Sequence, residues 1–239
     1  MSTEKMKIEI WADIACPYCF IGKKKLENVL QKYPHADQVE LVWHSYELDP
    51  GLKKEPAGTS YLDYYKDGKD ILDGLYQLSE AVGIKFNFDR VVITSTADAL
   101  RTVKFARNYD LAADTIEAFF QAYFTNGECI SDRKVITEIA KKVGLPVDEL
   151  VRTLDSNEYI AELTQDIRYS EDILILQYIP FYLFNNKTVI QGSIPDEVYL
   201  ETLEKSFANW NVNGISTSEE KEFAFCYSPN ASGLSCSIG

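Results

Sequence analysis

Two cysteines stand three residues apart in the segment Cys16-Pro17-Tyr18-Cys19. A Cys-x-x-Cys pair serves either as a dithiol redox couple or as half of a zinc site. A zinc site needs a second pair or histidines at ligand spacing, and the two histidines, His35 and His44, form no such cluster. The residue types therefore favour redox chemistry over metal binding, and we expect no metal.

The flanking segments predict a strand-to-helix junction around this pair. Residues 7–11 alternate polar and apolar side chains, as a strand does. Apolar residues then recur at helical spacing from Leu26 to Tyr33, so that a helix follows. Cys16 is expected at or next to the N-terminus of this helix, where unpaired N–H groups and the helix dipole stabilise a thiolate. Pro17 suits the first turn because its missing N–H would have no helical partner there.

Composition limits the function classes. The chain has 239 residues, a formal net charge of −13 and a sequence pI near 4.7. Such an acidic chain lacks the basic surface that nucleic acids or anionic membranes require, so neither partner is expected. Its first ten residues have no apolar signal-peptide core, and no stretch is long enough to span a bilayer. We expect the reducing cytoplasm as the compartment, where a Cys-x-x-Cys pair is more often catalytic than a structural disulfide.

The rest of the chain predicts an α/β sheet domain interrupted by helices. A second strand is expected at 39–46, and helical periodicity runs almost throughout 59–176. Strand character returns at 181–184, followed by the turn-forming pair Asn185-Asn186 and a strand at 187–191. A last helix begins near Pro195.

This order defines three predicted parts of the chain. A discontinuous sheet domain comprises 1–58 and 177–210, and an all-helical insertion between the second and third strands comprises 59–176. A Ser-, Asn- and Gly-rich tail, 211–239, is expected to be loosely ordered and carries a second cysteine pair.

The sequence resembles the DsbA-like thioredoxin-fold oxidoreductases, specifically the FrnE-like group of 2-hydroxychromene-2-carboxylate isomerase/DsbA relatives. The resemblance covers nearly the whole chain. Its motifs are Asp13 to Cys19, Tyr46-Glu47-Leu48-Asp49-Pro50, Gly127 to Leu150, and Ile179-Pro180-Phe181-Tyr182. It implies a thioredoxin fold with a large all-helical insertion, which agrees with the order of elements above.

The resemblance also gives meaning to Ile179 and Pro180. In thioredoxin folds a cis-proline at this point faces the Cys-x-x-Cys pair and leaves the backbone of the preceding residue free to bind an extended substrate peptide. A trans proline that begins a strand is the alternative. We therefore predict that Ile179 and Pro180 contribute to substrate binding.

Three functions are compatible with these features. The leading one is a thiol–disulfide oxidoreductase or isomerase that acts on thiols and disulfides of proteins or small molecules. In this reaction Cys16 attacks a substrate disulfide and Cys19 resolves the mixed disulfide that results. The second is a glutathione-dependent isomerase or transferase on an aromatic or polyketide substrate; those relatives typically have Ser in place of Cys16 and lack Cys19. The third is a chaperone-like or redox-sensing binding protein. We expect no bound cofactor, with glutathione as a conceivable co-substrate.

The remaining cysteines are Cys129, Cys226 and Cys236. Cys129 is expected to be a spectator thiol. Cys226 and Cys236, ten residues apart, form either an auxiliary redox pair that exchanges with Cys16–Cys19, a local structural disulfide, or two free thiols.

Overall fold

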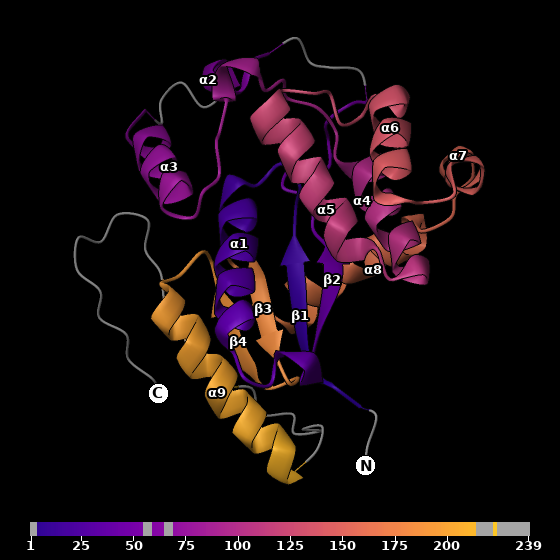
Figure 1. The fold of residues 1–239 in the computed structure, drawn as a ribbon. Helices are drawn as coiled ribbons and strands as arrows, with labels where there is room; N and C mark the ends of the chain where they lie inside the picture. The colour runs from indigo at the N-terminus through magenta and orange to yellow at the C-terminus, as the bar shows by residue number, and fades with distance from the viewer. Residues whose placement is uncertain (1–3, 55–58, 65–68, 214–221, 224–239) are drawn as a thin grey trace.

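A computed structural model describes residues 4–54, 59–64, 69–213 and 222–223. Its centre is a mixed sheet of order β2-β1-β3-β4-β5. The strands β1 to β4 are labelled in Figure 1. β1 is parallel to β2 and antiparallel to β3, β3 is antiparallel to β4, and β4 is parallel to β5. The strands are β1 (Met6–Ala12), β2 (Val39–Ser45), β3 (Phe181–Phe184), β4 (Thr188–Gln191) and β5 (Glu222–Phe223).

Helices lie on the sheet and extend beyond one of its ends. α1 and α9 pack against each other over one face, whereas α4 and α8 contact β2 (Figure 1). The α-helices are α1 (Pro17–Lys32), α2 (Tyr61–Tyr64), α3 (Lys69–Ala81), α4 (Ala97–Ala106), α5 (Ala112–Phe120), α6 (Arg133–Val143), α7 (Val147–Asp155), α8 (Ile160–Arg168) and α9 (Asp196–Asn213). Short 3-10 turns are η1 (Ala36–Gln38), η2 (Phe88–Arg90) and η3 (Arg107–Tyr109), and single π-helical stretches are η4 (Gln121–Asn126) and η5 (Tyr169–Ile173).

The alternation of the central strands produces two cores. Because successive side chains of a strand point to opposite faces, Ile8, Ile10 and Tyr182 join the large core beneath α1 and α9. Trp11 and Phe181 point the other way, into a smaller cluster. The largely buried strand β1 and the fully buried strand β3 thus fix the position of the loop that carries the two cysteines.

Aromatic packing joins the insertion to the sheet domain. Phe20, one residue after the second cysteine, stacks on Phe120 of α5 with ring centroids 5.0 Å apart. The ring contacts continue to Phe86 and Phe124 within the helical part. The first helix is therefore held from both sides, by its own sheet and by the inserted helices.

The predicted fold class is confirmed: α2 to α8 lie between the second and third strands of a thioredoxin-like sheet. Asn185 and Asn186 have positive φ angles of 48° and 58° in the β3–β4 turn, as predicted. α9 continues to Asn213, past the predicted start of the tail, and β5 adds a short strand. The exact domain boundaries stay a prediction, and Cys226 and Cys236 lie outside the described residues.

Within the described ranges, no helix is both long enough and apolar enough to cross a membrane.

Candidate active site

The junction between β1 and α1 places both cysteines where the sequence predicted. Cys16 is the N-cap residue of α1 and Pro17 is the first helical residue. The turn is closed by hydrogen bonds from the Cys16 N–H to the Asp13 carbonyl (3.1 Å) and from the Cys19 N–H to the Cys16 carbonyl (3.0 Å). Both cysteines are free thiols, 4% and 1% exposed. The helix N-terminus therefore directs its positive end at the first sulfur and not at the second.

The segment before β3 meets this turn. The Ile179–Pro180 peptide bond is cis, and the thiol of Cys16 lies 3.9 Å from the carbonyl oxygen of Ile179. The Pro180 carbonyl accepts a hydrogen bond from the Gly192 N–H (2.7 Å), which anchors the segment to the end of β4. The predicted cis geometry and its proximity to Cys16 are thus confirmed.

The surroundings of Cys19 oppose its ionisation. Burial is the largest cause that raises its pKa well above the ordinary value, followed by the hydrogen bond and the charge of Cys16. The charge of Asp13 acts in the same direction, whereas a backbone hydrogen bond from Asp13 partly offsets it. An external reagent therefore meets a thiol at Cys19 that is both covered and protonated.

Asp13 is a buried acid beside this pair, and its importance could not be recognised from the sequence of an acidic chain. It is 1% exposed. Its carboxylate accepts hydrogen bonds from the N–H groups of Leu48 (2.8 Å) and Ala15 (3.3 Å). Burial raises its pKa to about 6, although these bonds and one from Thr96 favour the charged form. Such a group exchanges protons near neutral pH, which suits it to proton transfer at Cys19.

A groove of about 310 Å³ opens at Cys16. Its walls come from the turn after Cys16, the segment after β2, the helices α2 and α3, and the segment before Pro180. Most of the lining is apolar or aromatic: Cys16, Pro17, Tyr18, Tyr46, Leu48, Tyr61, Ile71, Leu72, Leu75, Leu176, Gln177, Tyr178 and Ile179. Leu48, Ile71 and Tyr178 are about half exposed, at 47%, 53% and 48%. Unpaired apolar surface of this kind beside a reactive thiol suits an apolar or peptide-like substrate.

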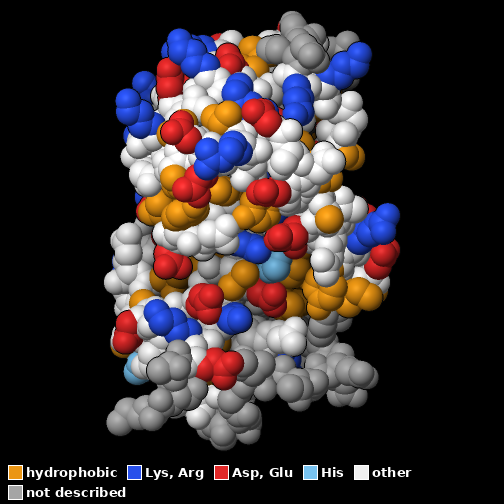
Figure 2. All heavy atoms as spheres, turned by 90° about the vertical axis from the view of Figure 1, so that its right-hand side faces the viewer, with side chains coloured by type: hydrophobic (Ala, Val, Ile, Leu, Met, Phe, Trp, Pro, Cys, Tyr) orange, Lys and Arg blue, Asp and Glu red, His pale blue; other side chains and the backbone are white. Residues whose placement is uncertain are grey.

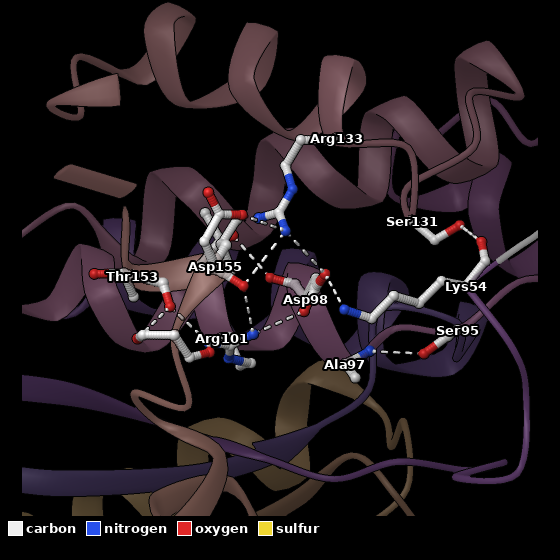
Figure 3. Close-up of polar contacts among 12 residues, drawn as sticks. Lys54, Ser95, Ala97, Asp98, Arg101, Ser131, Arg133, Thr153 and Asp155 are labelled. Atoms are coloured by element: carbon white, nitrogen blue, oxygen red, sulfur yellow. Dashed lines mark hydrogen bonds and ion pairs between the residues drawn. The ribbon is translucent and has the colours of Figure 1, made fainter. Parts of the chain in front are cut away.

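An ionic cluster in the helical part anchors Lys54, at the far end of the segment that follows β2. Figure 3 shows Lys54, Arg101 and Arg133 around the buried carboxylate of Asp98, with Lys54 at 2.7 Å and Arg101 at 3.0 Å. Arg101 also donates to the carbonyls of Thr153 and Ser156 at the end of α7 (2.7 Å each). The segment that begins at Leu48 is therefore fixed at both ends, by Asp13 and by Asp98.

A second hollow, of about 650 Å³, lies away from the cysteines on the side of the sheet near α8. His44 bridges two carboxylates there, Asp166 (3.1 Å) and Glu9 (3.1 Å), and stacks on Trp11 at 4.3 Å. Acidic and basic side chains are interspersed over this face (Figure 2). The charges of its lining side chains largely neutralise one another.

Nothing in the described part of the chain resembles a metal site, because no three His, Cys, Asp or Glu side chains converge there.

Comparison with known proteins identifies the class. The model of the DSBA-like thioredoxin domain matches residues 7–207. The chain therefore belongs to the DSBA-like thioredoxin family, whose members include oxidoreductases and isomerases that act on thiols and disulfides.

Solved structures agree with this assignment. A probable DsbA oxidoreductase from Streptomyces coelicolor is 26% identical, with a TM-score of 0.78 over 98% of this chain and 99% of that one. Two further structures share the fold at lower identity. A 2-hydroxychromene-2-carboxylate isomerase is 14% identical (TM-score 0.66; 88% of this chain, 100% of that one). The cytosolic disulfide reductase DsbM from Pseudomonas aeruginosa, solved with glutathione, is 16% identical (TM-score 0.59; 86% and 98%).

Proposed function

We propose that the protein is a thiol–disulfide oxidoreductase whose redox couple is Cys16–Cys19. The observation that carries the proposal is the asymmetry of the pair. Cys16 caps α1 and faces the groove, whereas Cys19 lies behind it, fully buried and with a raised pKa. An attacking and a resolving thiol need such different surroundings.

The reaction proceeds in two exchanges. The Cys16 thiolate attacks one sulfur of a substrate disulfide, so that a mixed disulfide forms and the first substrate thiolate leaves. Cys19 then loses its proton and attacks the Cys16 sulfur, which forms the Cys16–Cys19 disulfide and releases the second substrate thiolate. Two electrons pass from the dithiol to the substrate, and an oxidised pair reverses both steps.

Two groups around the pair support these steps. Asp13, with a pKa of about 6, is ionised at neutral pH and accepts the proton of Cys19. The backbone of Ile179, beside the Cys16 sulfur at the edge of the groove, suits an extended peptide, and the apolar groove suits the side chains of that peptide.

Glutathione is the small-molecule partner that we propose to reset the couple, by analogy with the fold neighbour solved with it. We also propose the reducing cytoplasm as the compartment, by analogy with that cytosolic neighbour and because a Cys-x-x-Cys pair in the cytoplasm is more often catalytic than structural. Fractionation of cells followed by alkylation of the free thiols tests this compartment.

Substrate trapping tests the function. Cys19→Ser leaves attack by Cys16 intact but prevents resolution, so mixed disulfides with substrates or glutathione should accumulate and disappear on reduction. Cys16→Ser should abolish both turnover and adducts, while the control Cys129→Ser should leave both unchanged. Adducts that persist in Cys16→Ser would refute the assignment of the nucleophile.

A further inference from the structure

Thr96 brings the helical insertion into contact with the acid of the candidate active site. Asp13 follows β1 and Thr96 precedes α4, and both side chains are buried. The Thr96 hydroxyl donates a hydrogen bond to the Asp13 carboxylate. The other donors to this carboxylate are the backbone N–H groups of Ile14, Ala15 and Leu48. Among the donors that the described residues supply, Thr96 is therefore the one that a substitution can remove.

The helix α4 does not use this hydroxyl for its own end. Thr96 is the N-cap residue of α4, and a threonine N-cap commonly accepts a hydrogen bond from a backbone N–H of the first turn. Here the residue has helical backbone angles (φ −97°, ψ −6°), and its side chain makes no capping bond. The Ser95 hydroxyl accepts from the Ala97 N–H instead, at 3.3 Å (Figure 3). The Thr96 hydroxyl is thus available to Asp13 without cost to the cap.

Asp13 and Thr96 line a small hollow beside the substrate groove. Its volume is about 110 Å³. Leu48 and Tyr61 line both spaces, whereas Cys16 belongs to the groove, and Asp13 and Thr96 belong to the hollow. A substrate that covers Cys16 therefore leaves the contact between the hydroxyl and the carboxylate in place.

Two titratable groups near Asp13 sense its charge at the pH of interest. Burial, then Cys16 and the charge of Asp13, raise the pKa of Cys19, which gives its proton to Asp13 in the proposed reaction. On the segment after β2, burial raises the pKa of Glu47, and the charge of Asp13 adds to this effect. Glu47 is therefore the second carboxyl group whose titration must be distinguished from that of Asp13.

The remaining charged groups around the hollow have partners of their own. Asp49 accepts a hydrogen bond from the Tyr64 hydroxyl (2.9 Å). Asp98, in the first turn of α4, is held between Lys54 (2.7 Å) and Arg101 (3.0 Å). The phenols that line the hollow or sense the charge of Asp13 are Tyr46, Tyr61, Tyr64 and Tyr123. Phenols ordinarily ionise near pH 10, so the carboxyl groups determine the charge of this region near neutral pH.

We propose that Thr96 is a positioning residue of the resolving step, because its hydroxyl holds the Asp13 carboxylate and sets the pH above which Asp13 accepts the Cys19 proton. The inference rests on the proposed function, since it concerns the proton acceptor of that reaction. Cys19 transfers its proton to the carboxylate, and the Cys19 thiolate attacks the Cys16 sulfur of the mixed disulfide. The substrate thiolate leaves with the electron pair of the broken S–S bond, and Asp13 returns the proton to water.

The hydroxyl can serve both protonation states of Asp13. It donates to the carboxylate before the transfer and can rotate to accept from the carboxylic acid afterwards, so Thr96 is unchanged by the cycle. A hydrogen bond to the charged form favours that form. Loss of the hydroxyl should therefore raise the pH that the resolving step requires.

Reaction with the aromatic disulfide DTNB separates the two exchanges. Each releases one coloured thionitrobenzoate, the first when Cys16 attacks and the second when Cys19 resolves. A higher DTNB concentration accelerates the first phase alone, because the second is intramolecular. Stopped-flow measurements are made from pH 5 to 9. The chain also carries Cys129→Ser, Cys226→Ser and Cys236→Ser, so that these thiols do not contribute.

Three substitutions in α4 and its cap give the comparison. Thr96→Val removes the hydroxyl and keeps the branched shape, and Thr96→Ser restores a hydroxyl. Thr102→Val is the matched control, because it also removes a buried hydroxyl of α4, one that donates to the Asp98 carbonyl (2.8 Å).

The expected signature is a shifted pH profile of the second phase. Loss of one hydrogen bond to a charged group should raise the pKa of Asp13 from about 6 by roughly one unit. At pH 6 the ionised fraction of Asp13, and with it the second phase, should fall roughly 5-fold. At pH 8 the second phase of Thr96→Val should be no slower than that of the parent. Thr96→Ser and Thr102→Val should keep the profile of the parent, and the first phase should be unchanged in all variants.

Two further measurements show that the effect passes through Asp13. A carbon-13 NMR titration of the Asp13 carboxyl group, identified as the signal missing in Asp13→Asn, should give the same shift of its pKa in Thr96→Val. In the Asp13→Asn background, Thr96→Val should no longer shift the profile of the second phase. In the Glu47→Gln background the shift should persist.

The possible failures are distinct. An unshifted profile in Thr96→Val, or an equal shift in Thr102→Val, would overturn the inference. Slowing by one factor at all pH values indicates a packing effect and also overturns it, as does a shift that persists in Asp13→Asn. A first phase that survives Cys16→Ser would instead refute the proposed function. Thermal unfolding checks that each variant is folded. If Thr96→Val is not, Thr96→Ala removes the same hydroxyl and takes its place in every measurement.

Discussion

The thiol of Cys16 lies 3.9 Å from the carbonyl oxygen of Ile179, a residue 163 positions away in the chain. The contact joins the N-terminus of α1 to the segment that enters β3, and the whole helical insertion lies between them in sequence. It leaves Cys16 at the edge of the groove and Cys19 behind it. The reactivity of the two thiols should therefore differ in order and in pH dependence.

The first prediction concerns alkylation of the reduced protein. Iodoacetamide should modify Cys16 before Cys19, because Cys16 opens to the groove whereas burial and Cys16 together raise the pKa of Cys19. Mass spectrometry of peptides after timed quenching gives the order, and the partly buried Cys129 serves as the internal reference. Earlier labelling of Cys19 would reverse the assigned roles.

A second prediction concerns the buried acid. The folded-state pKa of Asp13 is about 6 instead of 3.8, so ionisation of this group opposes folding by about 3 kcal/mol once the pH exceeds both values. Asp13→Asn should remove this effect, and its stability relative to the parent should rise as the pH increases through this interval and then level off. Urea unfolding at several pH values measures the difference.

The same substitution should slow the resolving step, because Cys19 loses its proton acceptor. A loss of roughly 100-fold or more is expected for removal of a general base. A variant whose relative stability does not change with pH would show that the carboxylate is not strained by burial. Unchanged resolution would remove Asp13 from the proton path.

Local sequence was sufficient for the reactive turn. The alternation of 7–11 and the helical spacing after Cys19 define a strand and a helix, and Pro17 marks the first helical residue. The ends of α6 are also set locally: the Asp132 side chain accepts a hydrogen bond from the Lys134 N–H at the N-terminus, and Gly144 ends the helix with a φ angle of 91°. These features are set by interactions between residues close in sequence.

Distant contacts could not be predicted in the same way. The importance of Asp13 depends on its burial and on the hydrogen bond from the Leu48 N–H, and the close approach of Tyr182 to α1 depends on the missing side chain of Gly22. Each of these facts arises when segments from different parts of the chain meet. The Cys16–Ile179 contact was predicted only because a family resemblance supplied the partner.

A third prediction concerns the ion network behind the sheet. Burial of His44 lowers its pKa, but Asp166 and Glu9 outweigh this effect and the net pKa is raised. A raised folded-state pKa means that protonated His44 stabilises the fold fully below its unfolded pKa and that this contribution is lost as the pH rises through the folded value. His44→Gln should therefore lose stability mainly at mildly acidic pH, while the difference from the parent shrinks at alkaline pH. A difference that is constant with pH would contradict protonation of the bridge.

A fourth prediction tests the groove. Ile71 is 53% exposed and lines the groove, so Ile71→Asp should weaken binding of apolar peptide disulfides. We expect KM for such a substrate to rise roughly 10-fold, because the variant loses one apolar contact and introduces a charge. Turnover of a small hydrophilic disulfide should change little. Ile160→Asp on α8 is the matched control, since Ile160 is similarly exposed but does not line the groove. Equal effects of both variants would argue against substrate binding in the groove.

The last prediction concerns Cys226 and Cys236, which lie outside the described residues. β5 is the described segment nearest to them: Phe223 pairs with Val189, and β5 runs parallel to β4. Continuing along β4 leads to Gly192, whose N–H binds the Pro180 carbonyl beside the active site. Cys226 follows Phe223 by three residues in the sequence, which is at most about 10 Å of extended chain.

If Cys226 and Cys236 act as a redox relay, replacement of both residues by Ser should slow glutathione-coupled turnover. The reduction potential of Cys16–Cys19 should stay unchanged, because the relay supplies electrons without altering the primary couple. Direct reduction of insulin by chemically prereduced protein, which needs no recharging, should be unaffected. Cys129→Ser is the control for loss of an unrelated thiol. Unchanged glutathione-coupled turnover together with an unchanged potential would eliminate the relay and leave the pair as a local disulfide or two free thiols.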